Sequence, residues 1–295
     1  MNNLSTAGPA IEANPERKGI KKGIYLIPTA FTTLNIGLGF YAIISSLRAF
    51  QYLAPNQPLL LATEVFDNAS RAIGLAIICD ALDGRLARMT KTTTEIGVQL
   101  DSIADVVTFG VAPAVMVYAW GYGSALAETH QLHKFGLIIS FIYLMCGGFR
   151  LARFNVQASR PRVLAEGTAK LDKKNFVGLP IPAAAGLIAA IIHFAPAPLL
   201  TLPSRQAELY SGGMMALVAC LSILMVSTLR YTSFKSISTE KASPRYLLIA
   251  IAVIGMLVWL YSHHVLLIIA SIYVGHGIVS RLISFVRRPQ AEAAV

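Results

Sequence analysis

The chain has 295 residues, of which 55% are hydrophobic and only 14% are charged, and its mean hydropathy is +0.60. Soluble domains carry about 25% charged residues, so this composition excludes an ordinary soluble domain. It also excludes a disordered chain, which needs low hydrophobicity. The net charge of +10 raises the question of a nucleic-acid partner, and the positions of the charges decide it.

Apolar stretches that are long enough to cross a membrane, about 20 residues each, follow one another along most of the chain. We therefore predict an all-α, polytopic membrane bundle with about eight transmembrane helices. The predicted spans are Leu26–Leu47, Thr63–Met89, Gly97–Trp120, Leu132–Phe154, Pro180–Phe194, Ala207–Leu229, Tyr246–Ser262 and Val265–Phe285.

Basic residues gather in alternate connections, a pattern that places those connections on the cytoplasmic side. Most of the 25 lysines and arginines lie in the N-terminal tail, after the second, fourth and sixth spans, and near the C-terminus. The four exceptions are Arg48, Arg71, Lys134 and Arg205. This arrangement predicts that both termini are cytoplasmic. It explains the positive charge by topology and by attraction to anionic lipid headgroups, so no nucleic-acid partner is expected.

Four aspartates interrupt the apolar pattern of the second and third spans. Asp80 and Asp83 are three residues apart, and Asp101 and Asp105 are four apart, so each pair lies on one face of its helix. The short connection around Lys91 makes the two helices an antiparallel hairpin, in which these faces can meet. Each buried ionised group costs about 2.5–3.5 kcal/mol on insertion scales, so we treat the four acids as a functional site.

Four close carboxylates repel one another unless cations neutralise them. Two divalent cations would balance their charge, and oxygen ligands favour hard ions. We therefore expect Mg²⁺ or Mn²⁺, with Ca²⁺ as a third ion of this class. All four acids lie toward the predicted cytoplasmic ends of their helices, where lipid phosphates lie, whereas transporter sites usually lie near the midplane.

Small residues accompany the acids at fixed positions. The run reads Asp80-x-x-Asp83-Gly84-x-x-Ala87-Arg88, then eight residues, then Gly97-x-x-x-Asp101-x-x-x-Asp105. It resembles the signature of the CDP-alcohol phosphatidyltransferases. The flanking segments resemble the bacterial-type phosphatidylserine synthases of that family, although Pro28-Thr29 stands where Pro-Asn is common. These segments are Leu100–Pro113, Phe149–Asn155 and Gly178–Gly186.

The resemblance implies an enzyme of phospholipid biosynthesis that moves the phosphatidyl group of CDP-diacylglycerol to the hydroxyl of L-serine and releases CMP. It implies a cytoplasmic tail over residues 1–22, a six-helix catalytic core over 23–230 and two further membrane helices over 231–295. It also implies a homodimer in the bacterial inner membrane, with the active site facing the cytoplasm. Membrane lipids are the remaining expected partners.

The resemblance also assigns roles to the residues of the run. Asp80, Asp83 and Asp101 would be the principal metal ligands, and Asp105 would be the general base and a further ligand. The CDP-lipid site would be lined by Gly84, Ala87, Arg88 and Gly97.

Two arginines in the cytoplasmic end of the fourth span, Arg150 and Arg153, are further candidates. They would bind the lipid phosphate or the serine carboxylate through paired hydrogen bonds. The alternative is that both extend to the interface without touching substrate.

Two other functions stay open at this stage. The first keeps the chemistry but changes the acceptor to choline, glycerol 3-phosphate or an inositol phosphate. The second is a transporter for cations or coupled to protons, which would use the same acids. The six histidines share no spacing of metal ligands, and we expect His263 and His264 in an outer loop. For Thr32, Thr33, Asn35 and Thr108 helix packing is a simpler role than substrate contact.

Overall fold

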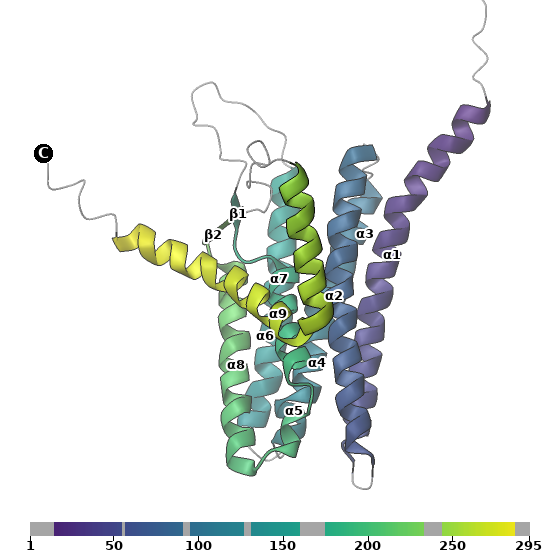
Figure 1. Ribbon diagram of the computed structural model, residues 1–295. Helices are drawn as coiled ribbons and strands as arrows, with labels where there is room; N and C mark the ends of the chain where they lie inside the picture. The colour runs from purple at the N-terminus through teal and green to yellow at the C-terminus, as the bar shows by residue number, and fades with distance from the viewer. Residues whose placement is uncertain are drawn as a thin grey trace, which may run out of the picture.

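The computed structural model describes residues 15–54, 57–90, 95–126, 131–159, 175–232 and 244–286. Within these residues the chain is almost entirely helical (Figure 1). The elements are α1 (Pro15–Gln51), α2 (Leu59–Thr90), α3 (Glu95–Asp105), the π-helical turn η1 (Val106–Val111), α4 (Ala112–Trp120), α5 (Tyr122–Ala125), α6 (Gln131–Ser159), β1 (Asn175–Val177), α7 (Ile181–Phe194), the 3₁₀ turn η2 (Leu199–Thr201), α8 (Ser204–Val226), β2 (Arg230–Thr232) and α9 (Pro244–Val286).

Six stretches of the described residues are long and apolar enough to cross a membrane, which confirms the predicted helical membrane bundle. They are Thr29–Gln51, Ile96–Ala125, Gln131–Val156, Ile181–Thr201, Ser204–Val226 and Ala252–Ser280. The helix α2 covers the predicted second span but carries the acids and is not one of the six. The count of eight spans and the orientation of the termini remain predictions.

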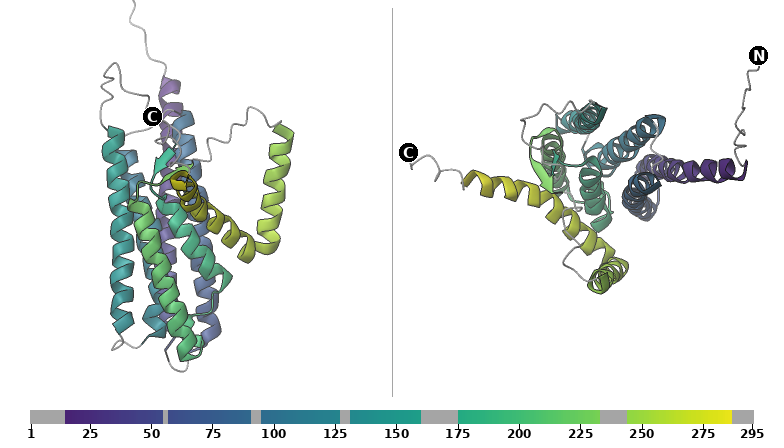
Figure 2. Two further views of the ribbon diagram at one scale, coloured as in Figure 1. Left: turned by 90° about the vertical axis from the view of Figure 1, so that its left-hand side faces the viewer. Right: turned by 90° about the horizontal axis from the view of Figure 1, so that it is seen from above.

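The two predicted C-terminal spans correspond to the two halves of α9. Non-helical backbone angles at Tyr261 (φ −133°, ψ 42°) separate these halves by a kink. The first half of α9 stands apart from the bundle, and the second half turns back toward it and then projects outward (Figure 2). The predicted outer loop at His263 and His264 is therefore wrong, because both residues lie inside α9, just after the kink.

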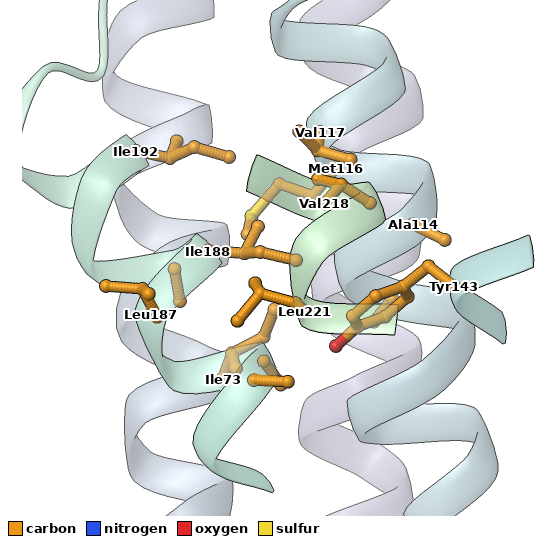
Figure 3. Close-up of a cluster of buried hydrophobic side chains, with 14 of the residues drawn as sticks. Ile73, Ala114, Met116, Val117, Tyr143, Leu187, Ile188, Ile192, Val218 and Leu221 are labelled. Atoms are coloured by element: carbon orange, nitrogen blue, oxygen red, sulfur yellow. The ribbon is translucent and has the colours of Figure 1, made fainter. Parts of the chain in front are cut away.

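The core lies where α2, α4, α6, α7 and α8 meet. Figure 3 shows Ile73 of α2, Met116 of α4, Tyr143 of α6, Ile188 of α7 and Leu221 of α8 in one cluster, and all five are fully buried. Close packing of this kind holds helices together in a membrane, where lipid is as apolar as the side chains. Large apolar residues on the outer faces of the bundle are exposed, as expected of surfaces that face lipid.

The turn η1 interrupts the helical hydrogen bonding directly after Asp105. Side chains of neighbouring helices bond to the backbone of this turn. Tyr143 of α6 donates a hydrogen bond to the carbonyl of Phe109 (3.0 Å). Thr108 donates to the carbonyl of Asn35 on α1 (3.0 Å), which joins the turn to α1. Gly39 of α1 lies so close to Thr108 that a Cβ atom there would clash. A π-helical turn therefore fixes the end of α3 against α1 and α6.

A small antiparallel ribbon joins α7 to the end of α8, and it is an addition to the predicted all-α fold. Phe176 of β1 pairs with Tyr231 of β2. Gly178, which follows β1, has a positive φ of 83°, and its amide donates to the carbonyl of Leu229 (2.8 Å). A side chain at this position would meet the carbonyl oxygens of Met225 and Ser227.

We expect Gly178→Ala to destabilise the protein, because left-handed backbone costs an L-residue about 1–2 kcal/mol and the Cβ would also clash. Thermal unfolding in detergent should show a lower melting temperature. The matched control is Gly212→Ala on α8, where a Cβ atom has no neighbour within 4 Å. Equal melting temperatures for the two variants would contradict the role given to Gly178.

Candidate active site

Three of the four predicted acids converge in the structure. Asp80 comes from α2, and Asp101 and Asp105 come from α3, and one carboxylate oxygen of each lies within 4.8 Å of the others. All three side chains are partly buried. The i, i+4 spacing of Asp101 and Asp105 places them one turn apart on the same face of α3. The predicted hairpin therefore gathers these acids at one point.

Asp83 lies beside this group rather than in it. Its carboxylate is buried and accepts a hydrogen bond from the hydroxyl of Thr32 on α1. It is still close enough for its charge to act on Asp101 and Asp105. The role of Asp83 as a metal ligand stays a prediction. For Thr32 the sequence analysis favoured helix packing over substrate contact and did not foresee a bond to an acid of the site.

The donor set fits a hard divalent cation. The converging ligand atoms are all carboxylate oxygens, the type that Mg²⁺, Mn²⁺ and Ca²⁺ prefer. The Oδ1 atom of Asp105 is buried and has no hydrogen-bond partner among the described residues. A buried polar atom of this kind is costly unless something binds it, so this oxygen is available to a cation or to a substrate proton.

Two of the predicted CDP-lipid residues, Gly84 and Gly97, can be described in the structure. Gly84 is half-buried one turn after Asp80, and Gly97 is exposed one turn before Asp101. The side chains of Ala87 and Arg88 lie outside the described residues. The role of these residues in binding the CDP-lipid stays a prediction.

The two candidate arginines of α6 differ in their surroundings. Arg150 is partly buried and lies close enough to Asp105 for their charges to interact. Its Nε atom is buried and has no hydrogen-bond partner in the described part of the chain. Arg153 is exposed. The structure thus brings Arg150, but not Arg153, to the acidic group.

A polar contact near the acids was missed by sequence reasoning. The side-chain amide of Asn155 on α6 donates to the hydroxyl of Ser102 (2.8 Å), which lies next to Asp101 and donates to the carbonyl of Val98 (3.0 Å). Both residues lie in segments that carry the family resemblance, and this was the feature of the sequence that could have pointed to them. Their contact fixes the end of α6 against α3.

A second polar group was also missed. Asp67, His193 and His263 offer ligand-type atoms within 4.8 Å of one another. These residues come from α2, α7 and α9, far apart in the sequence, so spacing could not reveal them. The one local feature that pointed to this group was a charged pair inside an apolar span. Asp67 and Arg71 form this pair, with an ion pair of 2.7 Å.

We expect Asp80→Asn to weaken Mn²⁺ binding about tenfold or more, because it removes one negative ligand from the converging set. Electron paramagnetic resonance of free Mn²⁺ during titration of the purified protein in detergent measures this. The control is Glu208→Gln, which removes an exposed acid on α8. Wild-type Mn²⁺ affinity in Asp80→Asn would remove that residue from the site.

Comparisons with known proteins agree with this geometry. A family model described as CDP-alcohol phosphatidyltransferase matches residues 25–226. The CDP-diacylglycerol–serine O-phosphatidyltransferase of Helicobacter pylori strain J99 is 30% identical over 263 residues, which cover 87% of this chain and 91% of that protein. Proteins of the same name from Bacillus subtilis and Saccharomyces cerevisiae are 32% and 34% identical, over 55% of this chain in each case and over 72% and 51% of their own lengths. This chain belongs to the CDP-alcohol phosphatidyltransferase family.

Proposed function

We propose that the protein transfers the phosphatidyl group of CDP-diacylglycerol to the hydroxyl of L-serine, giving phosphatidylserine and CMP. The observation that carries this proposal is the convergence of Asp80, Asp101 and Asp105 inside the residues that match the family. The names of the similar proteins from Helicobacter, Bacillus and yeast support serine as the acceptor. Membership of a transferase family favours an enzyme over the alternative of a transporter.

Two divalent cations, Mg²⁺ or Mn²⁺ with Ca²⁺ as a third candidate, belong to this proposal. Asp80, Asp83, Asp101 and Asp105 would hold them. When bound, such ions neutralise charge on a diphosphate and stabilise the leaving phosphate. The oxygen-only donor set and the unpartnered Oδ1 of Asp105 support this assignment.

Asp105 is the proposed general base. A serine hydroxyl is a weak nucleophile at neutral pH and needs a positioned group to accept its proton. The buried Oδ1 of Asp105 has no protein partner among the described residues, which supports its availability for that proton. The serine oxygen then forms a bond to the phosphorus that carries the diacylglycerol, and the bond from that phosphorus to the CMP oxygen breaks.

Gly84, Ala87, Arg88 and Gly97 are the proposed residues of the CDP-lipid site. The positions of Gly84 and Gly97, one turn from Asp80 and Asp101, support a close approach of the diphosphate to the backbone. Small residues are useful here because a charged, flat nucleotide must reach acids that lie between helices.

For the arginines, we propose that Arg150 binds the carboxylate of serine and that Arg153 serves at the membrane interface. A guanidinium group matches a carboxylate through two parallel hydrogen bonds. The partial burial of Arg150 beside Asp105 supports the first role, and the exposure of Arg153 supports the second. Arg150 would thereby place the serine hydroxyl near the base.

The location and assembly of the protein are also proposals. We place it in the bacterial cytoplasmic membrane, with the active site facing the cytoplasm and with a homodimer as the assembly. The basic connections of the sequence support this orientation. Substrates of this class are consistent with it, because serine and CMP are water-soluble and the lipid lies in the membrane.

The experiment that tests the function supplies the purified protein with CDP-diacylglycerol, Mn²⁺ and a panel of acceptors, namely L-serine, choline, glycerol 3-phosphate and inositol phosphate. Mass spectrometry of the lipid product should identify phosphatidylserine, together with release of CMP. A different phosphatidyl lipid would show that another alcohol of the panel is the acceptor. Cation flux in sealed vesicles without release of CMP would instead favour the transporter.

We expect Asp105→Asn to lower kcat by about 10²–10⁴-fold, the usual contribution of a general base, with little change in binding of the CDP-lipid. A CMP-release assay gives kcat, and protection against thermal unfolding gives lipid binding. Turnover near that of the wild type would refute the assignment of the base.

We expect Arg150→Ala to raise the KM for serine about tenfold or more, because a charge-assisted pair contributes about 1.5–3 kcal/mol. The KM for CDP-diacylglycerol should stay within about twofold of the wild type. Arg153→Ala is the matched control on the same helix, and its serine KM should not change. Equal effects of the two substitutions would contradict the role of Arg150.

A further inference from the structure

The helix α1 packs against the hairpin that carries the acids. It runs alongside α2 (Figure 1) and also contacts α3 and the turn η1. Its buried residues at this level include Thr32, Asn35 and Gly39, which share one side of the helix through their i, i+3, i+7 spacing. The next residue after Thr32, Thr33, is exposed. One face of α1 is therefore turned toward the elements that supply the site.

Two hydrogen bonds join this face to both arms of the hairpin. The hydroxyl of Thr32 donates to the Oδ2 atom of Asp83 on α2. One turn further along α1, the carbonyl of Asn35 accepts from the hydroxyl of Thr108 (3.0 Å), which lies in the turn η1 that follows Asp105. The contact between Thr32 and Asp83 is thus part of a longer seam between α1 and the hairpin.

Close packing fixes the position of α1 in this seam. Gly39 lies so near Thr108 that a Cβ atom at Gly39 would meet the Thr108 backbone as well as its side chain. Small residues allow such close approach between helices in a membrane. The helix that carries Thr32 is therefore held by η1, independently of the bond that Thr32 makes to Asp83.

The bond of Thr32 has a different reach from those of other hydroxyls in the bundle. A hydroxyl within a helix commonly bonds to the carbonyl four residues earlier, and Thr33 and Ser222 each make such a bond (2.8 Å). Those bonds stay within one helix. The hydroxyl of Thr32 reaches a carboxylate on another helix, and both residues are buried. This bond can therefore orient an acid of the site.

Asp83 is the acid for which orientation matters most. It is only 6% exposed, and it stands outside the group formed by Asp80, Asp101 and Asp105, whose ligand atoms lie within 4.8 Å of one another. A carboxylate has two oxygens and about four sites that accept bonds. One hydrogen bond to Oδ2 therefore restricts the rotation of the group and leaves it the capacity to bind a cation.

We propose that Thr32 is a positioning residue for Asp83, which it holds in a fixed direction for a divalent cation. This inference rests on the proposed function, in which Asp83 holds such an ion. Hydrogen-bonded partners of metal ligands contribute about 10- to 100-fold to metal affinity, because they orient the ligand before the ion binds. The helix α1 supplies none of the four acids, yet through Thr32 it sets the metal affinity of the site.

The test is a titration of the purified protein in detergent with Mn²⁺, in which electron paramagnetic resonance measures the free ion. Thr32→Val keeps the shape of the side chain and removes the donor, so we expect the Mn²⁺ affinity to fall about tenfold. Thr32→Ser keeps the hydroxyl, and its affinity should stay within about twofold of the wild type. The matched control is Thr33→Val, which removes an exposed hydroxyl of the same helix and should leave the affinity unchanged.

A double-mutant cycle with Asp83→Asn separates orientation of this acid from a general effect on the fold. In the Asp83→Asn background, Thr32→Val should have little further effect on Mn²⁺ affinity, because the carboxylate that Thr32 orients is gone. Wild-type affinity in Thr32→Val, an equal loss in Thr32→Ser, or an equal loss in both Asp83 backgrounds would overturn the inference while the protein still makes phosphatidylserine. A wild-type protein that binds no Mn²⁺ and releases no CMP would instead overturn the proposed function.

Discussion

The cost of placing carboxylates between helices in a membrane is the constraint on which the site depends. An ionised aspartate there needs a partner of opposite charge, a hydrogen-bond donor or a ligand. In this protein Thr32 donates to Asp83, and Arg150 lies near Asp105, but one arginine cannot balance four acids. The remaining negative charge is what the proposed divalent cations would neutralise.

The backbone next to Asp105 is also irregular. A π-helical turn begins directly after Asp105, and such turns are frequent at functional sites because they re-aim the residues beside them. Here Tyr143 and Thr108 fix the turn against α6 and α1, and close contact at Gly39 leaves no room for a side chain. Helix packing on two sides therefore holds the turn that follows Asp105.

The hairpin of acids could be predicted from the sequence because it depends on local spacing. Asp101 and Asp105 share a face through the helical repeat, and a short connection brings Asp80 opposite them. Contacts that join distant segments left no such signal. Hydropathy predicts two helical segments at the C-terminus, which are the two halves of α9, but it does not predict the direction that each takes from the kink at Tyr261. The pairing of His193 with Asp67 and Ser262 depends on the packing of α2, α7 and α9, which no sequence period reports.

The helix α2 carries two aspartates, Asp67 and Asp80, whose surroundings differ. Both oxygens of Asp67 have side-chain partners, Arg71 and His193, and the bond to His193 joins α2 to α7. About 20 Å along the same helix, Asp80 meets acids of α3, and the nearby Asp105 keeps a buried oxygen without a partner among the described residues. The two aspartates therefore differ in their surroundings. Asp67 is paired with side chains of its own and a neighbouring helix, whereas Asp80 meets two further acids, an arrangement that favours a cation as the missing partner.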